Sequence, residues 1–187
     1  MLGEQPAGRG EDRAQGQRFP AVPVISALGV PYTKEPVTVY SRGATNIVAA
    51  MRNHRVSRLV CVTSMGVEGK SAPEESLLWR RVIAPILLTM GRTIYADMAR
   101  MEDIVRGSDL DWTIVRPAGL FDRDTVTSYR AEPRRLVGRF TSRADLADAL
   151  LREATENRHV HPCIDVVTTG EHTELPPGLG EGGAAHR

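Results

Sequence analysis

Short apolar runs alternate with longer amphipathic stretches along the middle of the chain. Residues 22–28 and 58–63 are compact apolar runs bounded by turn residues, a pattern typical of strands that are buried on both faces of a sheet. Between them, residues 38–54 carry apolar side chains on one side and polar side chains on the other, which predicts an amphipathic helix. The order strand, helix, strand is typical of a parallel α/β sheet.

The same alternation continues through the second half of the chain. Residues 74–106 have helical periodicity, and we expect Pro85 or Gly91 to break this stretch into two helices. The predicted fold class is therefore α/β with a parallel sheet. The remaining elements are expected over 112–115 (strand), 142–156 (helix) and 163–167 (strand).

The two ends of the chain lack this patterning. Residues 1–20 are polar and rich in Gly and Pro, so we expect a flexible or non-native arm. Residues 170–187 contain a Pro-Pro pair and several glycines, and we expect a disordered tail. A single patterned domain over residues 21–169 remains.

Charge and composition exclude several classes of partner. The 24 Lys and Arg residues nearly balance the 23 Asp and Glu residues, so the sequence predicts no nucleic-acid partner. The longest apolar run, around residues 82–90, is shorter than the roughly 20 residues that span a bilayer, so no membrane partner is expected. Cys61 and Cys163 fit neither a zinc nor a redox spacing. We expect a cytoplasmic protein without a signal peptide.

Six short segments follow one another in a recognisable order. VISALG spans 24–29, GATNIVAAM spans 43–51 and RLVCVTS spans 58–64. ME at 101–102, SDLDWTIVRP at 108–117 and FTSRADLA at 140–147 complete the series. Together they resemble the atypical short-chain dehydrogenase/reductases, a group that includes NmrA-like proteins and biliverdin-IXβ (flavin) reductase. The resemblance covers residues 22–168 and implies a Rossmann-like sheet that binds NADP or NAD.

The glycine-rich front half of that family's pattern is absent. In that pattern a glycine-rich turn follows the first strand and brings backbone N–H groups to the cofactor pyrophosphate. No G-x-x-G-x-x-G occurs in the sequence, and its one G-x-G-x-x-G, at residues 178–183, lies in the expected C-terminal tail and not between a strand and a helix. By the family's order, the strand at 24–28 corresponds to the fourth strand, so we expect an N-terminally incomplete domain. Two explanations compete. Either the gene is truncated, which we favour, or a short protein has its exposed sheet edge covered by a second copy or a partner chain.

The candidate cofactor site lies at the carboxyl ends of the expected strands, where parallel sheets bind their ligands. Small and hydroxyl residues follow each of these strands and allow close approach to the backbone. The alternative is that small residues only make tight turns there. The expected cofactor-binding residues are Ala27, Leu28, Gly29, Thr63, Ser64, Pro117, Ala118, Gly119 and Leu120.

Two hydroxyl residues are the catalytic candidates. Tyr95 lies on the long helix where the wider superfamily has a Tyr-x-x-x-Lys pair, but position 99 is Ala99, and Arg100 points about 100° away round the helix. Ser64 follows the second strand, where the resemblance places a hydroxyl near the nicotinamide or the substrate. Each has a structural alternative: Tyr95 as a packed helix residue and Ser64 as a turn cap.

Met65 and Trp79 are the candidate substrate-lining residues, and their alternative role is in the core. No metal site is predicted, because Pro162 interrupts the alternating His159, His161 and Cys163 and no fourth ligand is near.

Three hypotheses for function follow from the resemblance. The first is an NAD(P)H-dependent reductase that acts on a small conjugated acceptor such as a flavin or a quinone. The second is an NmrA-like regulator that binds a dinucleotide without turnover, and the third is an inactive fragment. Hydride transfer depends more on positioning than on a strongly tuned acid or base, so the broken Tyr-x-x-x-Lys pair does not decide between the first two.

Overall fold

A computed structural model describes residues 22–31, 33–69 and 76–170. The main sheet has five strands in the order β1-β2-β3-β7-β5, and the first four are parallel to one another. β5 pairs with β7 in the antiparallel direction at one edge, and β4 and β6 form a separate parallel pair. The strands are β1 (Val24–Ser26), β2 (Arg58–Val62), β3 (Asp111–Pro117), β4 (Gly119–Phe121), β5 (Tyr129–Glu132), β6 (Phe140–Ser142) and β7 (Cys163–Thr168).

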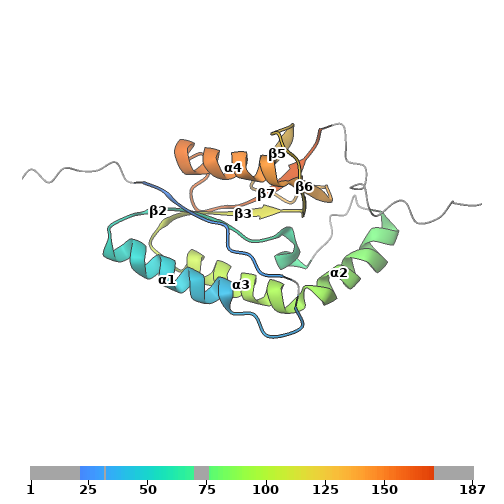
Figure 1. Cartoon of the computed structure of the whole chain (residues 1–187), viewed down its shortest axis with the longest axis horizontal. Coiled ribbons are helices and arrows are strands. Elements are labelled where there is room, and N and C mark those ends of the chain that lie inside the picture. The colour runs from blue at the N-terminus through green and yellow to red at the C-terminus, as the bar shows by residue number, and fades with distance from the viewer. Residues whose placement is uncertain (1–21, 32, 70–75, 171–187) are drawn as a thin grey trace, which may run out of the picture.

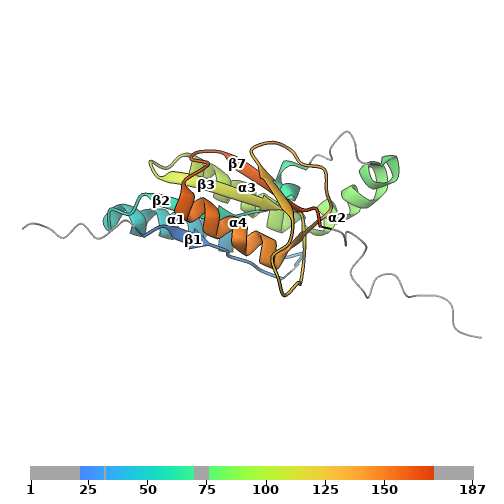
Figure 2. The same cartoon turned by 90° about the horizontal axis from the view of Figure 1, so that it is seen from above.

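Helices cover both faces of the main sheet (Figures 1 and 2). α1 (Val39–Asn53) and α3 (Arg92–Arg106) lie on one face, and α4 (Arg143–Glu156) lies on the other. Because side chains of a strand alternate between faces, Leu59 and Cys61 of β2 join the core under α1 and α3. Val60 and Val62 of the same strand join the core under α4. The central strands are therefore apolar on both faces, as a covered parallel sheet requires.

A short helical extension follows β2. It consists of η1 (Met65–Glu68), then η2 (Trp79–Ile83), which is a π-helix, and α2 (Ala84–Met90). Figure 1 shows α2 projecting beyond the end of the sheet at which the parallel strands end. No single helix in the described ranges is long and apolar enough to cross a membrane. Segments Arg80–Met90 and Arg92–Arg106 reach that threshold only together, and they meet at an angle of 78°.

The structure confirms the α/β class and the expected order of elements. The long helical stretch breaks at Gly91, which separates α2 from α3. Three short strands, β4, β5 and β6, were not predicted, and β5 makes the sheet mainly rather than wholly parallel. The expected arm over 1–20 lies outside the described residues, as does all of the expected 170–187 tail except Gly170.

Candidate functional site

The predicted cofactor-binding residues lie at the carboxyl ends of three neighbouring strands. Residues 27–29 follow β1, residues 63–64 follow β2, and residues 117–120 run from the end of β3 into β4. Since β1, β2 and β3 are parallel, these segments lie along the same edge of the sheet. Ala27 and Gly29 are exposed. The Thr63 backbone N–H donates a hydrogen bond to the Val115 carbonyl at 2.9 Å.

The two predicted catalytic residues, Ser64 and Tyr95, meet around Gly66. The Ser64 hydroxyl accepts a hydrogen bond from the Gly66 N–H at 3.1 Å and so caps η1. A Cβ atom built on Gly66 would lie 2.7 Å from the Tyr95 ring, and one built on Gly91 would lie 2.4 Å from the same ring. Glycine is needed at both positions because the ring fills the space between η1 and the start of α3.

A buried carboxylate holds the ends of β2 and β3 against α3. Glu102, only 1% exposed, accepts hydrogen bonds from the Thr63 hydroxyl at 2.7 Å and from two nitrogens of Arg116 at 2.9 and 2.6 Å. Arg106 donates to it at 2.7 Å, and Arg116 also pairs with Glu68 of η1. Burial alone would raise the Glu102 pKa, but the hydrogen bonds and the charges of both arginines hold it below its usual range. Glu102 therefore positions Thr63.

The loop between β5 and β6 folds over the same strand ends. Arg135 donates to the Met65 carbonyl at 2.9 Å, and the Leu136 N–H donates to Asp165 at 3.1 Å. Burial raises the pKa of the Asp165 carboxyl. Met65, a predicted substrate residue, is buried against Leu136 and Val167. The structure thus places the Met65 side chain in a small core beneath this loop.

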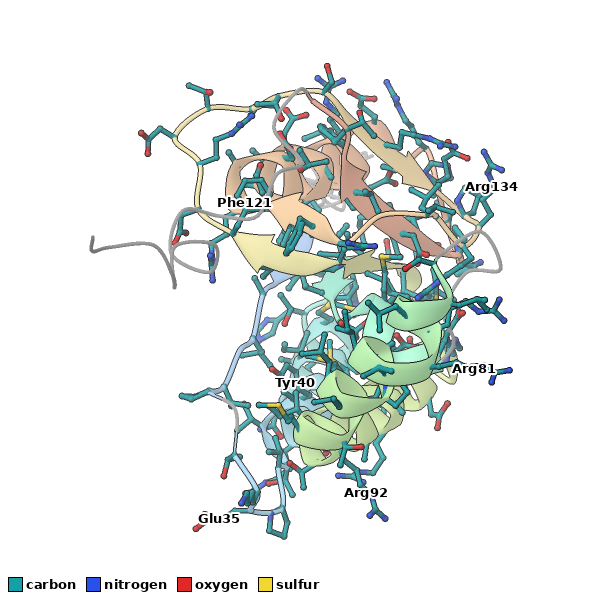
Figure 3. The ribbon with its side chains drawn as sticks, turned by 90° about the vertical axis from the view of Figure 1, so that its right-hand side faces the viewer. Glu35, Tyr40, Arg81, Arg92, Phe121 and Arg134 are labelled. Atoms are coloured by element: carbon teal, nitrogen blue, oxygen red, sulfur yellow. The ribbon has the colours of Figure 1, made fainter. Side chains whose placement is uncertain are left out.

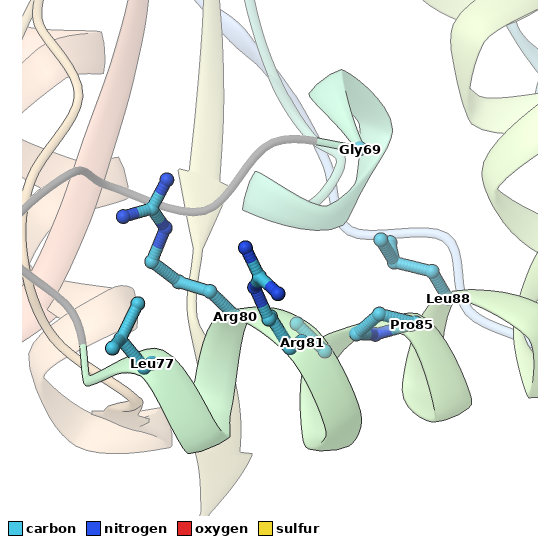
Figure 4. Close-up of a pocket in the computed structure, with 7 residues that line it drawn as sticks. Gly69, Leu77, Arg80, Arg81, Pro85 and Leu88 are labelled. Atoms are coloured by element: carbon cyan, nitrogen blue, oxygen red, sulfur yellow. The ribbon is translucent and has the colours of Figure 1, made fainter.

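Beyond Ser64, η1 leads to a pocket of about 500 Å³ between η1 and the η2–α2 helix (Figure 4). Two adjacent arginines extend into it from an otherwise apolar wall, and the sequence reading missed them. An Arg-Arg pair within an apolar stretch was the available signal. Trp79, the other predicted substrate residue, begins η2. The pocket is lined by Gly69, Leu77, Arg80, Arg81, Ala84, Pro85 and Leu88.

The alternating His159, His161 and Cys163 each contact a different partner. His159 bonds to Glu153, His161 bonds to the Leu110 carbonyl, and Cys163 accepts from Arg106. Within the part of the chain that the structure describes, no group of three or more His, Cys, Asp or Glu side chains could hold a metal ion.

The chain belongs to the NAD(P)H-binding family, whose pattern it matches over residues 14–157. This membership confirms the expected NAD(P)-binding, Rossmann-like character of the chain.

Individual relatives agree in fold. The short-chain dehydrogenase/reductase (wide type) from Veillonella parvula, solved with NADP, is 18% identical over 79% of this chain and 64% of its own, with a TM-score of 0.57. ChuY from Escherichia coli O157:H7, described as an anaerobillin reductase, is 18% identical over 84% of this chain and 68% of its own, with a TM-score of 0.59.

A curated relative, UPF0659 protein C216.03 of Schizosaccharomyces pombe, is 27% identical over 128 residues, which are 66% of this chain and 51% of that protein. The chain thus spans about half the length of this relative and about two thirds of the solved structures.

The residues at the strand ends fit one end of the cofactor better than the other. The Ser26 hydroxyl at the end of β1 is buried without a hydrogen-bond partner among the described residues, and a Cβ built on Gly29 would meet open space. These features, with the Ser64 hydroxyl after the neighbouring strand β2, suit a polar nicotinamide–ribose unit. Among the described residues, no glycine-rich turn joins a strand to a helix to receive a pyrophosphate. Ser26, residues 27–29 and Ser64 are therefore the groups that would hold the nicotinamide end.

Proposed function

We propose that this chain reduces a small conjugated acceptor, such as a flavin or a quinone, with NAD(P)H as the electron donor. The observation that carries the proposal is the meeting of Ser64 and Tyr95 around Gly66, between the strand ends and the pocket that Gly69 lines. Two hydroxyl groups beside the strand ends and this pocket support a site at which cofactor and acceptor would meet.

Reduction of the acceptor requires few reactive side chains. Reduced nicotinamide supplies a hydride when bound, and the acceptor takes up this hydride and one proton. The Ser64 oxygen accepts from the Gly66 N–H, so its O–H is oriented away from that bond and can donate to a carbonyl or ring nitrogen of the acceptor. The Tyr95 phenol, or water beside it, would supply the proton.

Arg100 does not take the place of the lysine in a Tyr-x-x-x-Lys pair. Arg100 donates instead to Asp97 at 3.1 Å and to the Val37 carbonyl at 3.1 Å, so its guanidinium is held at the start of α1. In the proposed reduction, the Tyr95 phenol would act as a proton donor to the acceptor.

The test is steady-state oxidation of NADPH and NADH with riboflavin, FMN and a soluble quinone as acceptors. We expect Ser64→Ala and Tyr95→Phe each to lower kcat/KM by about tenfold or more, since a positioned proton donor contributes at least that much. The matched control is Thr155→Ala, because this exposed hydroxyl on α4 bonds only within its own helix in the described structure. Binding of NADPH without turnover for every acceptor would contradict the proposal and favour a regulator that senses the dinucleotide.

A further inference from the structure

We propose that the pocket between η1 and the η2–α2 helix binds an acidic group of the substrate, so that the acceptor is an apolar conjugated molecule bearing a carboxylate or a phosphate. That the ligand is a substrate rests on the proposed function. The binding property itself is carried by the lining of the pocket and is tested without turnover.

The two arginines of the pocket come from one turn of an unusual helix. Arg80 and Arg81 both belong to η2, and Figure 4 shows both side chains leaving the helix on the side on which η1 and Gly69 lie. In a π-helix each turn holds more residues than in an α-helix, so adjacent side chains diverge less. The π-helix thus brings two neighbouring guanidinium groups to the same space, and such helices are frequent at functional sites.

The charged side chains that the structure describes in the lining of the pocket are positive. Arg80 and Arg81 are the ionisable side chains among the lining residues that the structure describes. The nearby carboxylate of η1, Glu68, pairs with Arg116 on the side of the sheet. No ion pair of Arg81 is found in the described ranges. A guanidinium presents a planar fork of donors that matches carboxylate and phosphate oxygens, so an anion is the complementary ligand.

The rest of the wall is apolar, which restricts the ligand further. Leu77, Ala84, Pro85 and Leu88 contribute hydrocarbon surface around the two arginines. A small inorganic anion would leave this surface in contact with water, whereas an amphipathic acid covers it. The volume of about 500 Å³ lies within the range of about 300–1,000 Å³ typical of small-molecule sites.

The experiment compares three probes of one shape by titration calorimetry with the whole chain. These are 2-naphthoate, 2-naphthyl phosphate and the neutral 2-naphthamide. We expect at least one acid to bind about tenfold more tightly than the amide, and its preference over the other acid identifies the acidic group. Arg81→Gln should raise the Kd of that acid about tenfold and leave the Kd of the amide unchanged. Arg80→Gln should act in the same direction.

Arg92→Gln is the matched control. Arg92 is an exposed arginine at the start of α3, and Figure 3 shows it at a different place on the helical layer from Arg81. This variant removes one positive charge from the same region and should leave all three Kd values unchanged. Circular dichroism of each variant confirms that the fold is retained.

Equal Kd values for acid and amide, an unchanged Kd in Arg81→Gln, or no binding of any probe would overturn the inference. Displacement of the acid by ADP would also overturn it, because the pocket would then serve a nucleotide phosphate. Acid-selective binding without any NAD(P)H turnover would uphold the pocket and contradict the reductase. If the chain instead turned over acceptors regardless of their charge and bound none of the probes, the reductase would be upheld and the acid-binding pocket contradicted.

Discussion

At the scale of single residues, Glu102 does the most to hold the candidate site together. Its carboxylate accepts hydrogen bonds from Thr63, the residue before Ser64, and from Arg116, the penultimate residue of β3. Arg106, on the same helix as Glu102, also reaches Cys163 of β7 at 3.2 Å. Glu102 and Arg106 together therefore link α3 to β3, to β7 and to the residue that follows β2.

Replacement of Glu102 by Gln is expected to destabilise the protein by about 3–5 kcal/mol, because it leaves the buried Arg116 guanidinium without its main counter-charge. Urea unfolding followed by circular dichroism measures the change. Glu132→Gln serves as the control, since Glu132 pairs with two arginines at the surface and its loss should change the midpoint little. A Glu102→Gln midpoint as close to wild type as that of the control would contradict this role.

The same carboxylate makes stability depend on pH. Its pKa is lowered in the folded protein, so the unfolded chain binds a proton more readily. The stabilisation is complete above the unfolded pKa of about 4.3 and is lost as the pH falls through the folded value. We expect the unfolding free energy of wild type to fall more steeply below pH 4.3 than that of Glu102→Gln. Parallel curves for the two proteins would show that other carboxylates carry the acid sensitivity.

At the scale of elements, α1 depends on α3 for its start. Thr38 precedes α1 without a capping side-chain hydrogen bond, and the first turn contains no acidic residue. Asp97 of α3 supplies the cap instead, since its carboxylate accepts from the Tyr40 N–H at 2.9 Å and the Ser41 N–H at 3.3 Å. A negative charge at a helix N-terminus also complements the helix dipole.

Asp97→Ala should therefore cost about 1–2 kcal/mol, the usual range for the loss of an N-cap. Chemical denaturation measures it, and amide hydrogen exchange of Tyr40 and Ser41 should become faster in the variant. Asp103→Ala on the same helix is the matched control, because Asp103 is 80% exposed. If those two amides kept their protection, the cap would have to come from elsewhere.

The elements that the sequence predicted are those with a local periodic signal. β2, β3 and β7 are rich in apolar and β-branched residues, and α1 and α4 have an apolar face, so burial specified each of them. β4 and β6 have three residues each and β5 has four, with mixed polarity. Their pairing arises only once the chain is folded, so no local pattern could have revealed it.

In the candidate site, too, the sequence predicted single residues but not how they are arranged. Ser64 and Tyr95 were identified individually because each occupies a recognisable position after a strand or on a helix. Their meeting around Gly66 depends on how η1 packs against α3, which the sequence does not encode locally. The direction of Arg80 and Arg81 depends on the π-helical turn, and a standard helical period would have separated them further.

At the scale of the whole molecule, β1 forms an edge of the sheet. It pairs with β2 on one side, and among the described residues no strand pairs with its other side. Ile25 on this strand is 39% exposed, so apolar surface accompanies the unpaired backbone. Open apolar edges are templates for pairing with another strand.

We therefore expect self-association through this edge, seen as a sedimentation coefficient that rises with protein concentration. Ile25→Lys should reduce the association, since a charge on an edge strand opposes strand addition. Leu151→Lys is the control, because Leu151 is 58% exposed on α4 and belongs to no strand. A monomer at every concentration, or equal effects of the two substitutions, would contradict pairing at β1.

The parallel sheet also bears on how quickly the molecule forms. Its central pairing brings Arg58 of β2 beside Asp111 of β3, a separation of 53 residues along the chain. Such contacts between distant residues raise the contact order. Chains of this kind fold slowly, because the entropy cost of closing long loops comes before the stabilisation from the contacts. The sheet core would then be assembled late, after α1 and α3 have had time to form as separate helices. Mild temperature and dilute refolding conditions should accordingly favour recovery of the native protein over precipitation.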